Sequence, residues 1–154
     1  MYLYLVQHGE AKKEEEDPAR GLTVKGIEDA RKSASFAAKA RVKVNRIFHS
    51  GKTRAEQTAN ILGEMLKPKE GVIVTENLAP TDDPAVWAKR ITETSEDTML
   101  VGHLPYMAKL AGLLLCGNGE KTFVEFKMGG IVCLKRLDDG RWLLDWMIVP
   151  ELIA

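Results

Sequence analysis

The chain has three histidines, and each follows a short apolar run of the kind that forms a buried strand. The runs and their histidines are residues 2–6 with His8, residues 44–48 with His49, and residues 98–101 with His103. If these strands are parallel, their carboxyl ends lie at one edge of the sheet, where open α/β sheets bind ligands. We therefore expect two or three of the imidazoles to converge at that edge.

Two arginines are placed to reach the same edge. Arg20 lies in the loop that follows the first predicted strand, and Arg54 lies in the first turn of the helix that follows the second. A guanidinium offers a planar fork of donors that suits phosphate, and the free amides at a helix N-terminus add to the attraction. Arginines and imidazoles around one point predict a pocket for a tetrahedral oxyanion.

The rest of the pattern supplies the elements that would hold this pocket. Apolar residues at helical spacing predict helices over residues 23–40, 53–66, 83–91 and 103–115. Short apolar runs predict strands over residues 2–6, 44–48, 72–75 and 98–101, and a hairpin of residues 130–137 and 141–149. This alternation favours an α/β fold of three layers, with a mostly parallel central sheet flanked by helices and a C-terminal antiparallel hairpin. The length fits one domain spanning residues 1–154.

The composition narrows the classes of partner. Lysine plus arginine and aspartate plus glutamate balance at 22 each, so bulk charge does not favour nucleic acid. No apolar run approaches the roughly 18 residues of a membrane span, and no signal-like segment opens the chain. Cys116 and Cys133 follow apolar residues without metal or redox spacing, so we expect both thiols to be buried. These features predict a cytoplasmic protein that binds neither nucleic acid nor membrane.

Four segments of the chain carry motifs in a consistent order. They are Gln7-His8-Gly9-Glu10 for RHG, Arg20 to Gly26 for R-x-L-T-x-x-G, Ser50 to Ala59 for S-x-x-x-R-A-E-Q-T, and Gly102 to Pro105 for G-H-x-P. On these motifs the chain resembles the histidine phosphatase superfamily, also called phosphoglycerate-mutase-like, and within it the small phosphohistidine phosphatases of the SixA type. The third segment is the most specific, and the resemblance spans nearly the whole chain.

The resemblance implies a catalytic set of His8, His103 and Arg54. His8 would attack phosphorus and become transiently phosphorylated, because covalent catalysis divides one hard displacement into two easier ones. The phosphoryl oxygens would contact Gln7, Arg20, Arg54 and His103, whose charge would stabilise a loose transition state. Water would then release phosphate from His8. Neither a metal ion nor another cofactor is implied.

Two features depart from the family pattern. Gln7 occupies the place of the arginine that begins RHG, so one phosphate-binding cation is missing, although an amide still donates a hydrogen bond. The segment 76–83 is too short to carry the general acid of larger relatives. That shortness suits a phosphohistidine substrate, because a P–N bond needs less help from an acid than an alkyl phosphate ester. Asp82 and Asp83 are expected to cap the following helix.

The sequence therefore predicts a metal-independent phosphatase that acts through a phosphohistidine enzyme intermediate on protein phosphohistidine. The partner would be a phosphorylated protein or a small phosphate ester. Two alternatives stay open: a general small-molecule phosphomonoesterase, and a non-catalytic module that binds phosphohistidine or phosphate.

Single residues also have alternatives. His49 occupies no motif position, which favours a surface or supporting role. The two arginines also have alternatives to binding phosphate. Arg20 would then pair with the acidic residues 14–17, and Arg54 would lie on the surface of its helix. Lys12 and Lys52 are candidates to replace the missing guanidinium.

Overall fold

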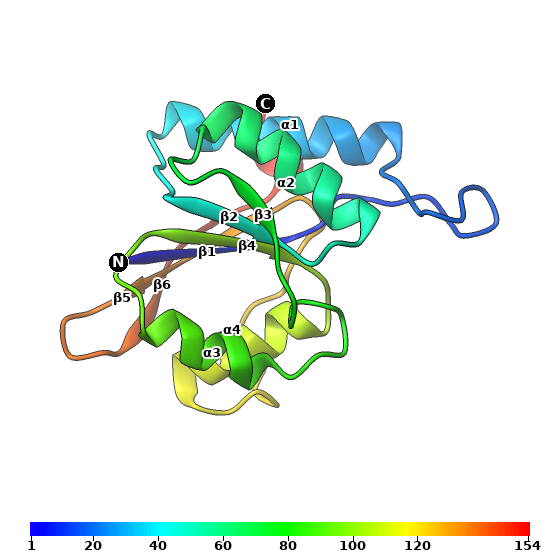
Figure 1. The fold of residues 1–154 in the computed structure, drawn as a ribbon. Coiled ribbons are helices and arrows are strands. Elements are labelled where there is room, and N and C mark those ends of the chain that lie inside the picture. Colours follow the sequence, from blue (N-terminus) through cyan, green and yellow to red (C-terminus); the bar gives the residue numbers. More distant parts are fainter.

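A six-stranded mixed sheet forms the centre of the molecule, whose computed structural model describes residues 1–154 (Figure 1). The strands are β1 (Tyr2–Gln7), β2 (Arg46–His49), β3 (Val72–Val74), β4 (Thr98–Gly102), β5 (Ile131–Arg136) and β6 (Trp142–Ile148). They lie in the order β3-β2-β4-β1-β5-β6. The first four pair in parallel, whereas β5 is antiparallel to both β1 and β6. The predicted parallel sheet and C-terminal hairpin are confirmed.

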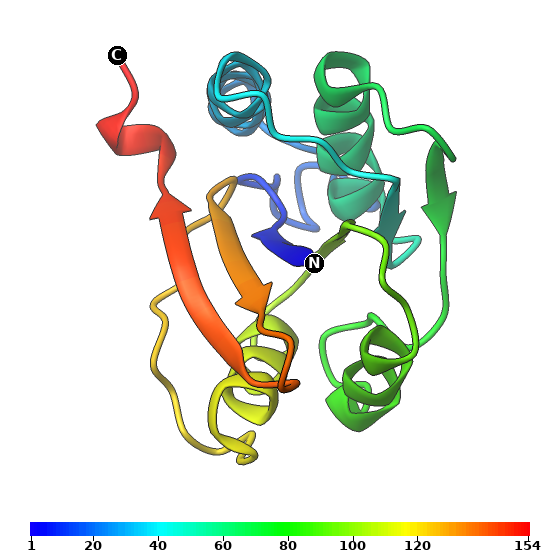
Figure 2. The same cartoon turned by 90° about the vertical axis from the view of Figure 1, so that its left-hand side faces the viewer.

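Helices cover both faces of this sheet. The four helices are α1 (Val24–Lys39), α2 (Thr53–Leu66), α3 (Pro84–Thr92) and α4 (Tyr106–Cys116), and a short 3-10 turn, η1 (Pro150–Leu152), follows β6. Figure 2 shows α1 and α2 above the sheet and α3 and α4 below it. The three predicted layers are therefore present. None of the helices combines the length and apolar character needed to cross a bilayer.

The central strand β1 joins the two halves of the core. Its side chains alternate, so Leu3 and Leu5 pack in the apolar cluster against α3 and α4, while Tyr4 and Val6 pack in the cluster against α1 and α2. A strand buried on both faces is continuously apolar, as residues 2–6 of this strand are. The end of β1 is therefore held rigidly from above and below.

The helix starts follow the predicted capping. The Thr23 side chain accepts a hydrogen bond from the Gly26 N–H, and the Asp83 carboxylate accepts one from the Ala85 N–H. Asp82 caps a different group, since its carboxylate accepts the Ala79 N–H. The predicted helix cap is therefore confirmed for Asp83 and wrong for Asp82, whose carboxylate holds the turn that precedes the helix.

Three predictions of detail are wrong. The helix predicted from residue 103 begins at Tyr106, because residues 103–105 form the turn that leaves β4. Strand β2 runs over 46–49 rather than 44–48, so His49 belongs to the strand. Cys133 is buried as expected, but Cys116 ends α4 beside Gly117 and is exposed. Both cysteines are free thiols.

The first turn of α1 lies directly against the backbone that follows β1. A Cβ at Gly26 would overlap the carbonyl oxygen of Glu10, and a Cβ at Gly9 would lie 2.9 Å from the carbonyl oxygen of Gly26. Both positions therefore need glycine because two backbones touch there. The glycine of the R-x-L-T-x-x-G segment thus sets how closely α1 approaches the turn after His8.

We expect Gly26→Ala to lower the free energy of unfolding by about 1 to 3 kcal/mol, because overpacking outweighs the gain of up to about 1 kcal/mol that alanine normally gives within a helix. Urea unfolding measures the change. Gly119→Ala, in the turn after α4, is the control for an added methyl group without overlap, since the nearest atom to its Cβ would be 3.4 Å away. Equal stability of the two variants would contradict this packing constraint.

Candidate active site

The structure brings His8 and His103 together at the carboxyl edge of the parallel strands. β1 and β4 are neighbours with Gln7 opposite Gly102, and the His8 backbone N–H donates to the Gly102 carbonyl oxygen at 2.9 Å. The ring centroids of the two histidines lie 5.1 Å apart, with the ring planes inclined by 53°. Parallel pairing of two adjacent strands thus places two imidazoles side by side.

The ring of His8 has a defined tautomer. Its Nδ1 lies 2.7 Å from the carbonyl oxygen of Gly9. A carbonyl oxygen only accepts, so Nδ1 carries the hydrogen. Burial lowers the pKa of His8, the bond to Gly9 partly opposes that shift, and the charges of Arg54 and Arg20 lower the pKa further. The imidazole is therefore neutral at pH 7, with an unprotonated Nε2.

Two guanidiniums lie near this pair. Arg54 stands in the first turn of α2, where burial and then the charge of Arg20 lower its pKa, and its buried Nε has no hydrogen-bond partner. Arg20 has a left-handed backbone with φ of 51°, and its Nε donates to the Lys12 carbonyl oxygen. Neither arginine forms an ion pair, so the predicted alternative of pairing with residues 14–17 is wrong. Like charges that converge without a carboxylate favour an anion between them.

His103 is the most deeply buried member of the group. It is 1% exposed, and its Nε2 lies 2.7 Å from the Ser50 hydroxyl oxygen. Burial, with the charges of His8, Arg54, Lys52 and Arg20, lowers the pKa of His103 to about 3. The ring is therefore neutral at pH 7.

Contacts that sequence reasoning missed hold the site together. The Gly9 N–H donates to Thr58 Oγ1 at 3.0 Å, and the Thr58 hydroxyl donates to the Arg54 carbonyl oxygen at 2.8 Å. Gln57 Oε1 accepts the Leu22 N–H at 2.7 Å. Thr58 thus connects the turn that carries His8 to the helical turn that carries Arg54. Its place four residues after Arg54, on the same face of a helix, is the sequence signal that could have found it.

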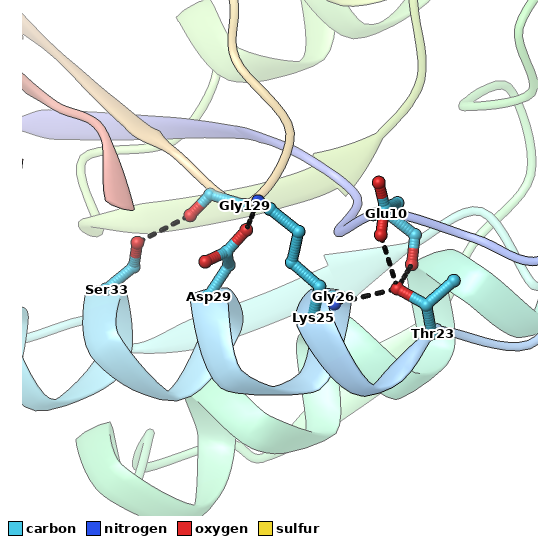
Figure 3. Close-up of polar contacts among 7 residues, drawn as sticks. All are labelled: Glu10, Thr23, Lys25, Gly26, Asp29, Ser33 and Gly129. Carbon is cyan, nitrogen blue, oxygen red and sulfur yellow. Dashed lines mark hydrogen bonds and ion pairs between the residues drawn. The ribbon is translucent and has the colours of Figure 1, made fainter. Parts of the chain in front are cut away.

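Helix α1 is fastened to this edge at two points (Figure 3). At its start, the Thr23 hydroxyl donates to Glu10 Oε2 at 2.7 Å. Lys25 and Asp29 form an ion pair along the helix. One helical turn after Asp29, the Ser33 hydroxyl donates to the Gly129 carbonyl oxygen at 2.6 Å. These contacts fix the loops on either side of the end of β1.

Gln7 ends β1 next to His8. Its backbone carbonyl oxygen accepts the Gly129 N–H at 2.9 Å, but its side-chain Oε1 is buried without a partner. No hydrogen bond within the protein holds the amide group. A buried polar group without a partner is unusual, and this one belongs to the residue that precedes His8 and lies opposite Gly102.

His49 does not join the other histidines. It is 5% exposed, and its Nδ1 accepts the Gly51 N–H at 3.1 Å. Since side chains alternate along β2, His49 shares the face of Ile47, which packs against α2. Burial lowers its pKa, partly opposed by the charge of Glu56. The predicted surface position of His49 is therefore wrong, and two of the three imidazoles converge.

The candidate site lies at the rim of the sheet and in none of the hollows of the surface. The largest hollow of the surface, about 560 Å³, lies at the amino ends of β2 and β4 and the carboxyl end of α2. It is lined by residues 43–45, 66–67, 69 and 95–97. None of the hollows is lined by His8, Arg20, Arg54 or His103. No group of three or more His, Cys, Asp and Glu side chains is arranged to hold a metal ion.

Known proteins are similar to this chain in sequence and in fold. Residues 3–98 match the family model of the histidine phosphatase superfamily, branch 1. Phosphohistidine phosphatase SixA of Escherichia coli (strain K12) is 24% identical over 97% of this chain and 94% of its own. A structure of the protein histidine phosphatase SixA complexed with tungstate has a TM-score of 0.86, with 24% identity and 97% of each chain covered. The α-ribazole phosphatase of Shigella flexneri has a TM-score of 0.80 at 14% identity, with 97% of each chain covered.

The buried neutral state of His103 predicts how stability depends on pH. An unfolded histidine binds a proton below about pH 6.5, whereas folded His103 does so only near pH 3, so acidification favours the unfolded chain. The free energy of unfolding should fall by up to about 1.4 kcal/mol per pH unit in that window on account of this group. His103→Gln should show a shallower fall in urea unfolding between pH 7 and pH 5. Parallel curves for the two proteins would contradict the buried neutral ring.

Proposed function

The chain belongs to the histidine phosphatase superfamily, and we propose that it removes phosphate from protein phosphohistidine through a phosphoenzyme formed on His8. The observation that carries this proposal is the pairing of a neutral His8 and His103, 5.1 Å apart, with two arginines that no carboxylate neutralises. A tetrahedral oxyanion would complete this arrangement. The SixA relative that binds tungstate, itself a tetrahedral oxyanion, supports the same interpretation.

The reaction would proceed in two displacements. Nε2 of His8 attacks phosphorus, and the bond between phosphorus and the leaving nitrogen or oxygen breaks with its electron pair on the leaving group, which takes a proton. Arg20, Arg54 and His103 stabilise the phosphoryl oxygens during transfer. Water then attacks phospho-His8, and phosphate and free His8 result. The arginines supply positive charge without a metal ion.

A protein substrate is supported by the form of the site. His8 lies partly exposed at this rim of the sheet, whereas His103 is buried, and the connection from β3 to α3, residues 75–83, is short. An imidazole leaving group needs little help from an acid, which suits a site whose surroundings offer cations and neutral histidines. A phosphohistidine-bearing protein can approach such a rim directly.

A small phosphate ester is the second candidate substrate. The similarity of fold to an α-ribazole phosphatase supports it. A non-catalytic module would follow if the loss of the motif arginine at Gln7 had abolished turnover. His8 with a free Nε2 and Arg54 beside it support turnover.

We place the protein in the cytoplasm with a phosphorylated protein as its partner. Cys116 and Cys133 are both free thiols, which fits a reducing compartment. The net charge of zero favours neither nucleic acid nor an anionic bilayer as the partner.

The test compares substrates under conditions that remove metal ions. A histidine-phosphorylated protein and para-nitrophenyl phosphate are incubated with the enzyme after exhaustive chelation, and phosphate release is measured. We expect release from the phosphohistidine protein to dominate, to survive chelation and to disappear in folded His8→Ala. Preference for the ester would favour a phosphomonoesterase. Binding of the phosphoprotein without release would identify a non-catalytic module.

Restoring the family arginine should improve the enzyme. Gln7→Arg adds a forked donor beside His8, and a hydrogen bond to a charged group is worth roughly 1.5 to 3 kcal/mol, so kcat/KM should rise about ten- to a hundredfold if the contact strengthens in the transition state. Lys52 is the cation best placed to compensate at present, since its charge acts on His103. The gain should therefore be larger in a Lys52→Ala background.

Lys12→Ala is the control for that comparison, because the charge of Lys12 acts on Asp17 rather than on the histidines. A fall in activity with Gln7→Arg in every background, with folding preserved, would show that Gln7 has a role of its own.

A further inference from the structure

The hydroxyl of Ser50 is the only hydrogen-bond partner of the His103 ring. Ser50 follows β2, His103 follows β4, and these strands are neighbours in the sheet. The Ser50 Oγ to His103 Nε2 distance is 2.7 Å, whereas His103 Nδ1 is buried and has no partner. This contact joins the start of the S-x-x-x-R-A-E-Q-T segment to the histidine of the G-H-x-P segment.

Hydrogen-bond accounting indicates which nitrogen of His103 carries its proton. The ring is neutral at pH 7, so it has one N–H and one lone pair. If the hydrogen were on Nδ1, a buried N–H would lack an acceptor, and native proteins largely avoid such orphaned donors. If it is on Nε2, the N–H donates to Ser50 Oγ and only a lone pair is left without a partner. The second arrangement costs less.

The hydroxyl of Ser50 has the capacity for this role. Its oxygen accepts the Lys52 backbone N–H at 3.3 Å through one lone pair, so the second remains for the His103 N–H. The hydroxyl hydrogen is then free to donate elsewhere. Ser50 therefore acts here as an acceptor held in place by the turn that begins α2.

We propose that Ser50 is a positioning residue that fixes His103 in the Nε2–H tautomer, opposite to the Nδ1–H tautomer that Gly9 imposes on His8. One of the two facing rings then offers a lone pair and the other a proton. This inference extends the proposed function in one respect: His8 would attack phosphorus while His103, still uncharged, donates to a phosphoryl oxygen. A charged oxygen is a stronger acceptor than a hydroxyl, so the His103 N–H can turn from Ser50 to the substrate.

In the competing interpretation, Ser50 only stabilises the turn in which it lies. Its bond to the Lys52 N–H stabilises the turn before α2, and loss of that bond would disturb the helix that carries Arg54. Such a role would change stability without changing the tautomer of His103. The test therefore needs a direct measurement on the His103 ring.

Long-range ¹H–¹⁵N NMR correlations of the imidazoles supply that measurement, and the chain has only three histidines to assign. In the wild-type protein at pH 7 we expect the Nδ1–H pattern for His8 and the Nε2–H pattern for His103. Ser50→Ala should shift His103 towards a mixture of tautomers and leave His8 unchanged, whereas Ser50→Thr should keep the wild-type pattern. Ser95→Ala, in the hollow distant from the histidines, is the matched control.

The Nδ1–H pattern for His103 in the wild type, or an unchanged pattern in Ser50→Ala, would overturn the inference whether or not the protein is a phosphatase. If phosphatase activity is present, Ser50→Ala should lower kcat/KM about tenfold, and Ser50→Thr should restore it. An absence of phosphatase activity with the expected tautomers would refute the proposed function alone. Thermal unfolding of each variant separates a loss of stability from a change at the ring.

Discussion

The hydrogen bond between His8 Nδ1 and the Gly9 carbonyl oxygen decides which nitrogen of His8 carries the hydrogen. The bond places the hydrogen on Nδ1, so Nε2 has the free lone pair. Its geometry depends in turn on the turn after β1, which Thr58 holds through the Gly9 N–H and which α1 approaches closely enough to need glycine at residues 9 and 26. The packing of α1 and α2 against the turn after β1 thus helps to determine the tautomer of His8.

Electrostatic repulsion is the second constraint on this edge of the sheet. Arg20 and Arg54 lie close enough to lower the pKa of both histidines, and no carboxylate pairs with either guanidinium. The repulsion between the two guanidiniums costs free energy in the absence of a ligand, and a bound oxyanion would offset that cost. The low pKa of His103 follows from burial first and from these charges second. The same cations therefore add to the burial that keeps the histidines neutral, and they leave positive charge at this edge without a carboxylate partner.

The periodicity of the sequence was sufficient to predict the layers of the fold. It also predicted the edge of the sheet where the candidate site lies, because the carboxyl ends of parallel strands lie on one side. The residues at that edge are His8, His103, Arg20 and Arg54. The order of strands came only from the structure, since residues far apart in sequence decide which strands pair. His49 was misplaced because a shift of the strand end by one or two residues determines whether a side chain faces a helix or the rim. Contacts such as Ser50 with His103 span 53 residues, and no spacing rule predicts them.

The most direct test of the account is the position of the phosphoryl group in the trapped enzyme. The enzyme is mixed with a histidine-phosphorylated protein, quenched within milliseconds in alkali, which preserves P–N bonds, and analysed by peptide mass spectrometry and ³¹P NMR. The structure predicts phosphate on His8 at Nε2, because Nδ1 is bound to Gly9. Phosphate on Nδ1, on another residue, or release of phosphate without any labelled enzyme would contradict it.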